Sequence, residues 1–208
     1  MTSTILIALF GGLALLLYGM RLTGEGLQRA AGARLRQILT HLTSNRFAAT
    51  LTGAGVTAII QSSTATTLML IGFVQAGVLS LYQAMGIILG TDIGTTLTVQ
   101  LLAVHVYDYA PLIVGLGFSV LFFAKRGLLK NLGQAVFGFG LIFLGLKLMI
   151  DGMAPLKESP LVAQGLLTFA ATPLLGIAAG ATFSAVVASS AATIGLTLAL
   201  AAHGLLPL

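Results

Sequence analysis

The sequence predicts an all-α membrane protein that crosses the bilayer several times, built as two inverted repeats with re-entrant helical hairpins and broken helices. Three observations lead to this prediction. Of the 208 residues, 57% are hydrophobic and only 7% are charged, whereas soluble domains carry about 25% charged residues. Polar and glycine positions of the first half recur in the second. One apolar segment is too long for a single crossing and has a polar cluster near its middle.

Charged and turn-forming residues divide the chain into apolar segments near residues 5–20, 47–81, 83–104, 109–124, 131–150 and 161–206. We expect these segments to be helical, because a backbone in lipid must satisfy its own hydrogen bonds and a crossing takes about 20 apolar residues. The chain has no cysteine, which excludes disulfides and thiolate metal sites.

An internal repeat relates the two halves. Segment 61–66 (Gln-Ser-Ser-Thr-Ala-Thr) matches segment 188–193 (Ala-Ser-Ser-Ala-Ala-Thr) at an offset of 127 residues, and Gly19 matches Gly145 at an offset of 126. We therefore expect residues 1–126 to form a first repeat and residues 127–208 a second repeat, incomplete at its C-terminus. Other matched pairs at these offsets are Gly12 with Gly138, Arg21 with Lys147, Glu25 with Asp151, and Gly53 with Gly180.

Basic residues orient the two repeats in the membrane. The chain has ten Lys and Arg against five Asp and Glu, a net charge of +5, and most of the basic residues gather between the first and second apolar segments and between the fourth and fifth. Such clusters mark cytoplasmic connections, and their place beside apolar segments argues against nucleic-acid binding. We expect a multi-pass protein of the cell (inner) membrane with its N-terminus outside. The residues of these two clusters are Arg21, Arg29, Arg34, Arg36, Arg46, Lys125, Arg126 and Lys130; Lys147 and Lys157 lie outside them.

Segment 47–81 is expected to enter the membrane and return. The chain between the two cytoplasmic connections must cross an even number of times, yet three apolar segments lie there. As one straight helix the 35 residues of segment 47–81 would be about 52 Å long, against a hydrocarbon core of about 30 Å. We expect a re-entrant hairpin with its tip at residues 61–67. The second repeat then starts in the opposite direction, which is typical of transporters with a midplane site.

Residues 61–67 place six hydrogen-bonding side chains in an apolar hairpin. Hydroxyls and amides can replace the hydration shell of an ion, and the N–H groups of a helix that starts after a break favour an anion. Asp92, between Gly90 and Gly94, is the only acidic residue deep in an apolar segment, so we expect it to bind the coupling cation or a proton and to pair with the tip. The alternatives are hydroxyls that bond their own helix and a carboxylate kept neutral by a nearby hydroxyl.

These motifs resemble the sodium/phosphate cotransporter family. The resemblance rests on Gln61-Ser62-Ser63, on its repeat at Ser189-Ser190 and on segment 90–96 (Gly-Thr-Asp-Ile-Gly-Thr-Thr), and extends from about Phe10 onward. It implies an inverted-repeat carrier that binds phosphate and sodium at the Gln-Ser-Ser segments of both halves, with sodium as coupling ion and no cofactor. The phosphate- and ion-binding residues are then expected to be Gln61, Ser62, Ser63, Thr64, Thr66, Asp92, Thr95, Thr96, Ser189, Ser190 and Thr193, with sodium among Gln61, Ser62, Asp92, Thr95 and Ser189.

The chain departs from the family pattern in three places. Ala188 replaces the second glutamine, Asp92 stands where the family commonly has asparagine, and the second repeat lacks about two helices. The expected function is sodium-coupled transport of phosphate, or of a similar tetrahedral oxyanion, by alternating access.

The alternative function is a non-transporting membrane module or fragment that anchors a cytoplasmic phosphate-signalling partner through the basic segment 21–46. Besides the bilayer, a cytoplasmic regulatory protein or further copies of the chain are the expected partners. An intramembrane enzyme is rejected, because the sequence offers no plausible set of nucleophile, base and metal ligands.

Overall fold

The structure is a computed structural model that describes residues 2–31, 45–103, 106–155 and 172–202, and every element in these ranges is a helix. The expected all-helical fold is therefore confirmed for this part of the chain. Residues 32–44, half of the basic segment 21–46, lie outside it, as do both ends of the apolar segment expected at 161–206. Two of the described helices, over Thr4–Ala31 and Leu128–Met153, are long and apolar enough to cross a membrane.

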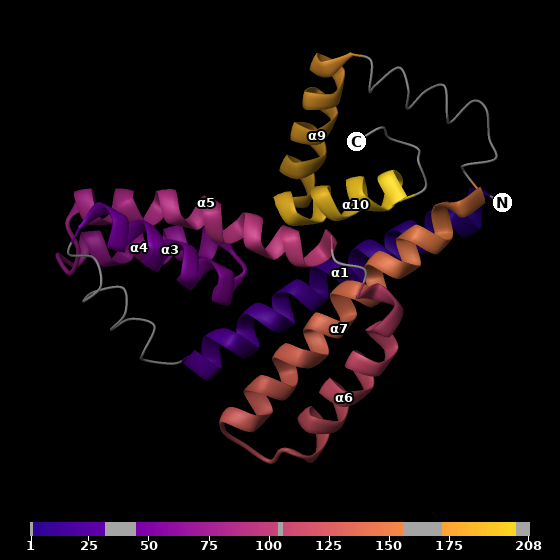
Figure 1. Ribbon diagram of the computed structural model, residues 1–208, viewed down its shortest axis with the longest axis horizontal. Coiled ribbons are helices and arrows are strands. Elements are labelled where there is room, and N and C mark those ends of the chain that lie inside the picture. Colours follow the sequence, from indigo (N-terminus) through magenta and orange to yellow (C-terminus); the bar gives the residue numbers. More distant parts are fainter. Residues whose placement is uncertain (1, 32–44, 104–105, 156–171, 203–208) are drawn as a thin grey trace.

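The two longest helices, α1 (Thr2–Ala31) and α7 (Leu128–Met153), pack antiparallel along most of their length (Figure 1). Glycines bring their backbones into contact. A Cβ at Gly19 would lie 2.6 Å from the carbonyl oxygen of Gly138, and one at Gly12 would lie 2.6 Å from that of Gly145. Small residues at such positions allow the close helix approach that is common in membranes.

A second row of glycines on α7 receives α6 (Ala110–Phe123), which follows the short 3-10 helix η1 (Tyr107–Tyr109). A Cβ at Gly140 would lie 2.7 Å from the amide nitrogen of Val114, and one at Gly133 would lie 2.7 Å from that of Leu121. The two glycine rows let α7 form the centre of a three-helix layer.

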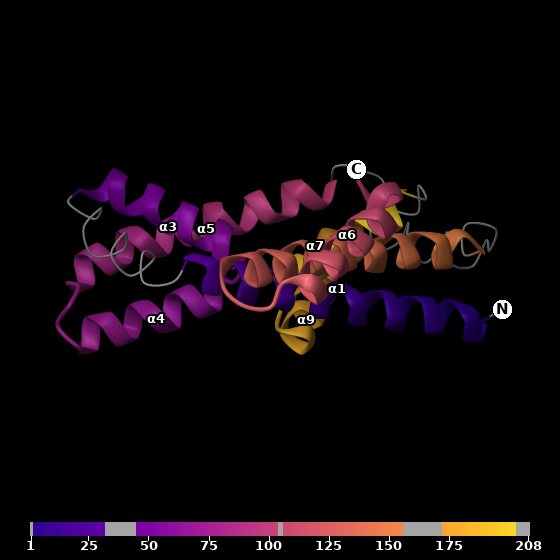
Figure 2. The same ribbon diagram turned by 90° about the horizontal axis from the view of Figure 1, so that it is seen from below.

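The apolar segment 47–81 is not one helix. It forms α3 (Arg46–Ile60) and α4 (Ser63–Gln75), and α5 (Leu81–Ala103) follows. The chain reverses between α3 and α4, so that α4 runs back beside α3 and α5 returns along α3 (Figure 2). A buried cluster joins the three helices through residues that include Val56, Leu70 and Ile87. The expected interruption is present, but it covers only Gln61 and Ser62, because residues 63–67 form the first turns of α4.

The second half repeats the lengths of this helix pair. Helix α9 (Pro173–Val187) has 15 residues, as α3 has, and α10 (Ser190–Ala202) has 13, as α4 has; each begins 127 residues after its counterpart. Helix α10 packs on α1 and α7, where Ala192 and Ala199 join a buried cluster with Leu16 and Met149. Helix α9 has no buried residue. The second helix pair is thus attached mainly through α10, with its break directed at α1.

Candidate functional site

The two helix pairs are broken by the same backbone device. Gln61 and Ala188 are the two non-glycine residues with positive φ among those described, at 57° and 51°. L-residues avoid this left-handed region, so each break is held by its surroundings. The amide of Gln61 donates to the carbonyl of Thr57 at 2.6 Å. Since Gln61 and Ala188 occupy matching positions of the repeat, the break is a feature of both halves.

A serine follows each break and caps the next helix. The Ser62 hydroxyl accepts a hydrogen bond from the amide of Ala65 at 3.2 Å, and the Ser189 hydroxyl accepts one from the amide of Ala192 at 3.2 Å. N-caps of this kind satisfy one free amide of the first helical turn. A hydroxyl that accepts in this way keeps its own proton to donate. Both serines can therefore still donate a hydrogen bond to a ligand.

Two threonines complete the matching hydrogen bonds. Thr66 donates through its hydroxyl to the Ser62 carbonyl at 3.0 Å, and Thr193 donates to the Ser189 carbonyl at 3.1 Å. Thr66, which is fully buried, also lies 3.2 Å from the hydroxyl of Thr57. These hydrogen bonds stabilise the first turns of α4 and α10.

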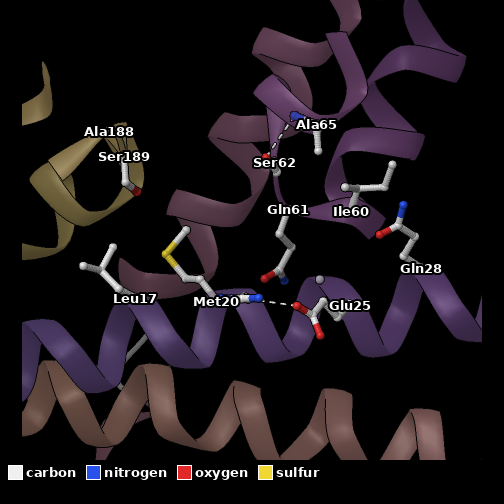
Figure 3. Close-up of a pocket in the computed structure, with 12 residues that line it drawn as sticks. Leu17, Met20, Glu25, Gln28, Ile60, Gln61, Ser62, Ala65, Ala188 and Ser189 are labelled. Carbon is white, nitrogen blue, oxygen red and sulfur yellow. Dashed lines mark hydrogen bonds and ion pairs between the residues drawn. The ribbon is translucent and has the colours of Figure 1, made fainter. Parts of the chain in front are cut away.

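The first tip (Gln61-Ser62) and the second tip (Ala188-Ser189) line one cavity of about 360 Å³ beside α1, here called the tip cavity (Figure 3). The two serines lie on different sides of it, and the Gln61 side chain extends toward Glu25 of α1. Its polar lining consists of Arg21, Glu25, Gln28, Gln61, Ser62 and Ser189, and the rest consists of Leu17, Met20, Gly24, Ile60, Ala65 and Ala188.

Helix α1 contributes the charged side of the tip cavity. Arg21 Nε lies 2.9 Å from Glu25 Oε1, and Arg29 Nη2 lies 3.2 Å from Glu25 Oε2. Gly24 brings α1 against the end of α3, because a Cβ there would lie 2.5 Å from the carbonyl oxygen of Ile60. Within the described structure, Gln61 Oε1 is buried without a hydrogen-bond partner. The side chain that carries this unused acceptor thus lines a cavity that also holds a carboxylate and a guanidinium.

The structure brings together three of the predicted site residues, Gln61, Ser62 and Ser189, in the tip cavity. Four others lie next to these in the first turns of α4 and α10. Of these, Ser63 and Thr193 are half-buried, while Thr64 and Ser190 are exposed. Thr66 is buried behind the first tip.

The predicted residues of α5 do not line the tip cavity. Asp92 and Thr96 are exposed, and the hydroxyls of Thr95 and Thr96 donate to the carbonyls of Thr91 and Ile93 in their own helix. The predicted pairing of Asp92 with the tip therefore has no counterpart in the lining of this cavity.

Arg21, Glu25 and Gln28 are the polar lining residues that the sequence did not indicate as site residues. In the sequence, orientation in the membrane is sufficient to explain Arg21, and Glu25 stands out only as the repeat match of Asp151. The sequence does contain a signal for a functional role of Arg21 and Glu25, because both lie in the continuous helix α1, whose apolar part begins at residue 4. Ionisable residues in such a helix are functional more often than not.

The geometry suits an anion together with a hard cation. Helices α4 and α10, of 13 residues each, both begin at the cavity, and helix N-termini favour negative charge. Arg21 adds a guanidinium, which binds oxyanions well. Oxygen atoms of Glu25 and Gln61 are ligands of the type that hard cations prefer. Among the described residues, no group of three or more His, Cys, Asp or Glu side chains could hold a metal ion.

Comparison with known proteins identifies a family and several relatives of the chain. The family described as Na+/Pi-cotransporter matches residues 15–151. Protein YjbB of Escherichia coli strain K12, whose name assigns it provisionally to inorganic phosphate export, is 33% identical over 201 residues, which are 97% of this chain and 37% of that protein. The same values hold for YjbB of Salmonella typhimurium strain LT2.

A relative without an assigned function also matches. The uncharacterised protein YqeW of Bacillus subtilis strain 168 is 29% identical over 204 residues, which are 98% of this chain and 66% of that protein. The chain thus spans little more than a third of the length of the YjbB proteins and about two thirds of YqeW. No solved structure matches the chain.

Proposed function

The chain belongs to the Na+/Pi-cotransporter family, and on this premise we propose that it moves inorganic phosphate across the cell membrane, coupled to sodium, by alternating access. The observation that carries this function is the tip cavity, which Ser62 and Ser189 from the two halves line together with Arg21. The name of the Escherichia coli relative includes phosphate as well. Alternating access is reversible, so the ion gradients set the direction of net transport.

The two halves are inverted repeats in this proposal. Gly12 and Gly19 of α1 correspond in the repeat to Gly138 and Gly145 of α7. The observed contacts pair Gly12 with Gly145 and Gly19 with Gly138. A two-fold axis across the antiparallel pair exchanges these two contacts, as is expected when one repeat is inverted relative to the other in the membrane.

The helix pairs α3–α4 and α9–α10 are re-entrant hairpins in this proposal. At 1.5 Å per residue, helices of 15 and 13 residues are about 22 Å and 20 Å long, less than the hydrocarbon core of about 30 Å. A pair of such helices reaches the middle of the membrane and returns. The N-terminus of the chain then lies outside and the connection around Lys125 lies in the cytoplasm.

Phosphate binds between the tips. The hydroxyls of Ser62 and Ser189 and the free amides of the first turns of α4 and α10 donate to its oxygens, and Arg21 balances its charge. The sodium ligands include Gln61 and Ser62, and Asp92 and Thr95 of α5 stay predicted ligands outside the tip cavity. Exchange of Asp92 for asparagine would leave sodium dependence unchanged if the carboxylate had no such role.

Transport in liposomes tests the function. We expect the purified chain to move radiolabelled phosphate faster with a sodium gradient than without one. Ser62→Ala and Ser189→Ala should each reduce the rate at least tenfold, because each removes a donor to the substrate and a helix cap. Ser119→Ala is the matched control: Ser119 is exposed on α6 and donates to the carbonyl of Gly115 in its own helix at 2.8 Å. This variant should keep the wild-type rate.

The alternative function is a non-transporting module that anchors a cytoplasmic phosphate-signalling partner. Ala188 favours it, because the second tip has a methyl group where the first has the Gln61 amide. A folded chain that shows no flux under any gradient, with the serine variants indistinguishable from wild type, would reject transport in favour of this alternative.

A further inference from the structure

The ion pair between Arg21 and Glu25 lies at the place where the proposed substrates bind. Both residues line the tip cavity, and the Arg21 side chain is 72% exposed while that of Glu25 is 32% exposed. Figure 3 shows this ion pair as a dashed line at Glu25, with the amide of Gln61 next to it. An ion or phosphate that enters the cavity therefore meets a pair of opposite charges that already neutralise each other.

The same pair differs from an ordinary helix-surface pair in its neighbours. Glu25 is also held by Arg29, and Arg29 in turn donates to Gln134 Oε1 of α7 at 3.3 Å. Glu25 would keep one cationic partner if Arg21 turned away. The Gln61 side chain lines the same cavity next to this pair, and its buried Oε1 has no hydrogen-bond partner in the described structure. Glu25 thus offers a carboxylate to a cation, and rotation of the Gln61 side-chain amide would add a carbonyl oxygen.

We propose that the Arg21–Glu25 ion pair is the charge switch of the tip cavity: phosphate takes the Arg21 guanidinium, and the released Glu25 carboxylate, with Gln61 Oε1, takes the coupling cation. This inference rests on the proposed function and deepens it, because it names the charged residues that link the two substrates. Arginine binds two oxygens of a carboxylate or a phosphate with the same fork of donors. Phosphate and Glu25 are therefore competitors for one side chain.

The competition links the two ions. Phosphate alone would leave the Glu25 carboxylate beside a second anion with Arg29 as its remaining partner, which opposes binding. A cation at Glu25 and Gln61 removes this repulsion and also weakens the hold of Glu25 on Arg21. Each ion then raises the affinity of the other by the same factor, as linkage requires. Without ligands, Arg21 and Glu25 neutralise each other. Phosphate binds with high affinity only when a cation binds as well.

Direct binding of phosphate to the purified chain in nanodiscs tests the switch. For wild type, we expect sodium to lower the Kd for radiolabelled phosphate. In Glu25→Gln, phosphate should bind without sodium about tenfold or more tightly than it binds wild type without sodium, and sodium should have no further effect. In Arg21→Gln, the affinity should fall about tenfold or more with or without sodium.

The matched control is a lysine in the second half. Lys147 is the repeat counterpart of Arg21 and lies 2.9 Å from Asp108, outside the tip cavity. Lys147→Gln should leave both the phosphate affinity and its sodium dependence at wild-type values. The result for Glu25→Gln is a gain in affinity, which a misfolded protein cannot give.

The outcomes separate the switch from the function on which it rests. Phosphate binding by wild type, together with unchanged sodium dependence in Glu25→Gln, overturns the charge switch and leaves the proposed function in place. Equal affinities of wild type and Arg21→Gln overturn it as well. A wild-type chain that binds no phosphate at millimolar concentration overturns the proposed function itself.

Discussion

At the scale of single residues, the left-handed backbone of Gln61 and Ala188 sets the position of both tips. Glycine is the usual residue for such a conformation, yet neither position has it. Each residue turns the chain once, so that a helix ends at the cavity and the next one begins there with a serine cap. The cost of the conformation is of order 1–2 kcal/mol per residue. Packing around the tips has to offset this cost.

We expect Ala188→Gly to stabilise the fold. Glycine removes the conformational cost of the left-handed backbone at residue 188. Its greater freedom in the unfolded chain, however, lowers the free energy of unfolding by about 0.4–1 kcal/mol. The net stabilisation should be roughly 0.5–1 kcal/mol, measured by unfolding in mixed detergent micelles. Ala185→Gly is the control, because Ala185 is exposed inside α9. It should destabilise by about 1 kcal/mol, and equal shifts for both variants would contradict strain at Ala188.

At the scale of elements, glycine rows decide which helices touch. Helix α7 has one row for α1 and another for α6, and on α5 Gly90 and Gly94 lie against α3. A Cβ at Gly94 would lie 2.5 Å from the carbonyl oxygen of Ala54. The same contact explains why Asp92, two residues away on another face, is exposed instead of directed at the tip. The packing of α5 on α3 thus keeps its carboxylate out of the tip cavity.

The contact of α1 with α7 should be sensitive to a single methyl group. We expect Gly19→Ala to destabilise the fold by about 1–3 kcal/mol, because its Cβ would lie 2.6 Å from a backbone oxygen that cannot move alone. Gly55→Ala makes the same change in α3, where nothing lies within 4 Å of the new Cβ. This control should be neutral or up to about 1 kcal/mol stabilising. Unfolding in mixed micelles distinguishes them, and similar losses would contradict a backbone contact at Gly19.

At the scale of the whole molecule, the proposed inverted repeat fixes the sides of the membrane on which the connections lie. If α3 and α4 enter and return, the turn before α5 and the connection after α6 lie on the same side. The chain has no cysteine, so single cysteines report their positions without background. Ala76 is exposed in the first of these connections and Lys125 in the second.

We expect Ala76→Cys and Lys125→Cys to react with a membrane-impermeant maleimide from the same side of the membrane, the cytoplasmic one. The physical reason is that α4 runs back beside α3, so the chain leaves the membrane on the side from which it entered, and α5 and α6 then add two crossings. Whole cells and inside-out vesicles give the two sides of the comparison. Labelling of the two cysteines from opposite sides would mean that segment 47–81 crosses the membrane and that the repeats are not inverted.

Much of the fold could be predicted from the sequence because the governing effects are local. Apolar segments in lipid must be helical, and the interruption of segment 47–81 follows from its length and from the polar residues at its centre. The repeat offset of 127 residues also relates the starts of α4 and α10, since serine caps act on the turn that follows them. The extent of the first tip was predicted too long, because Ser63 to Thr67 fit into α4 once Ser62 caps it.

The sequence by itself determined the helical class, the two matching breaks and the serines at each tip. Only the tertiary structure decided which helix faces meet at the tips: Arg21 and Glu25 of α1 line the cavity, and Asp92 of α5 does not. The reason is that helix formation and capping depend on neighbours within about four residues, whereas the direction of a side chain toward a site depends on which glycine row a distant helix packs against.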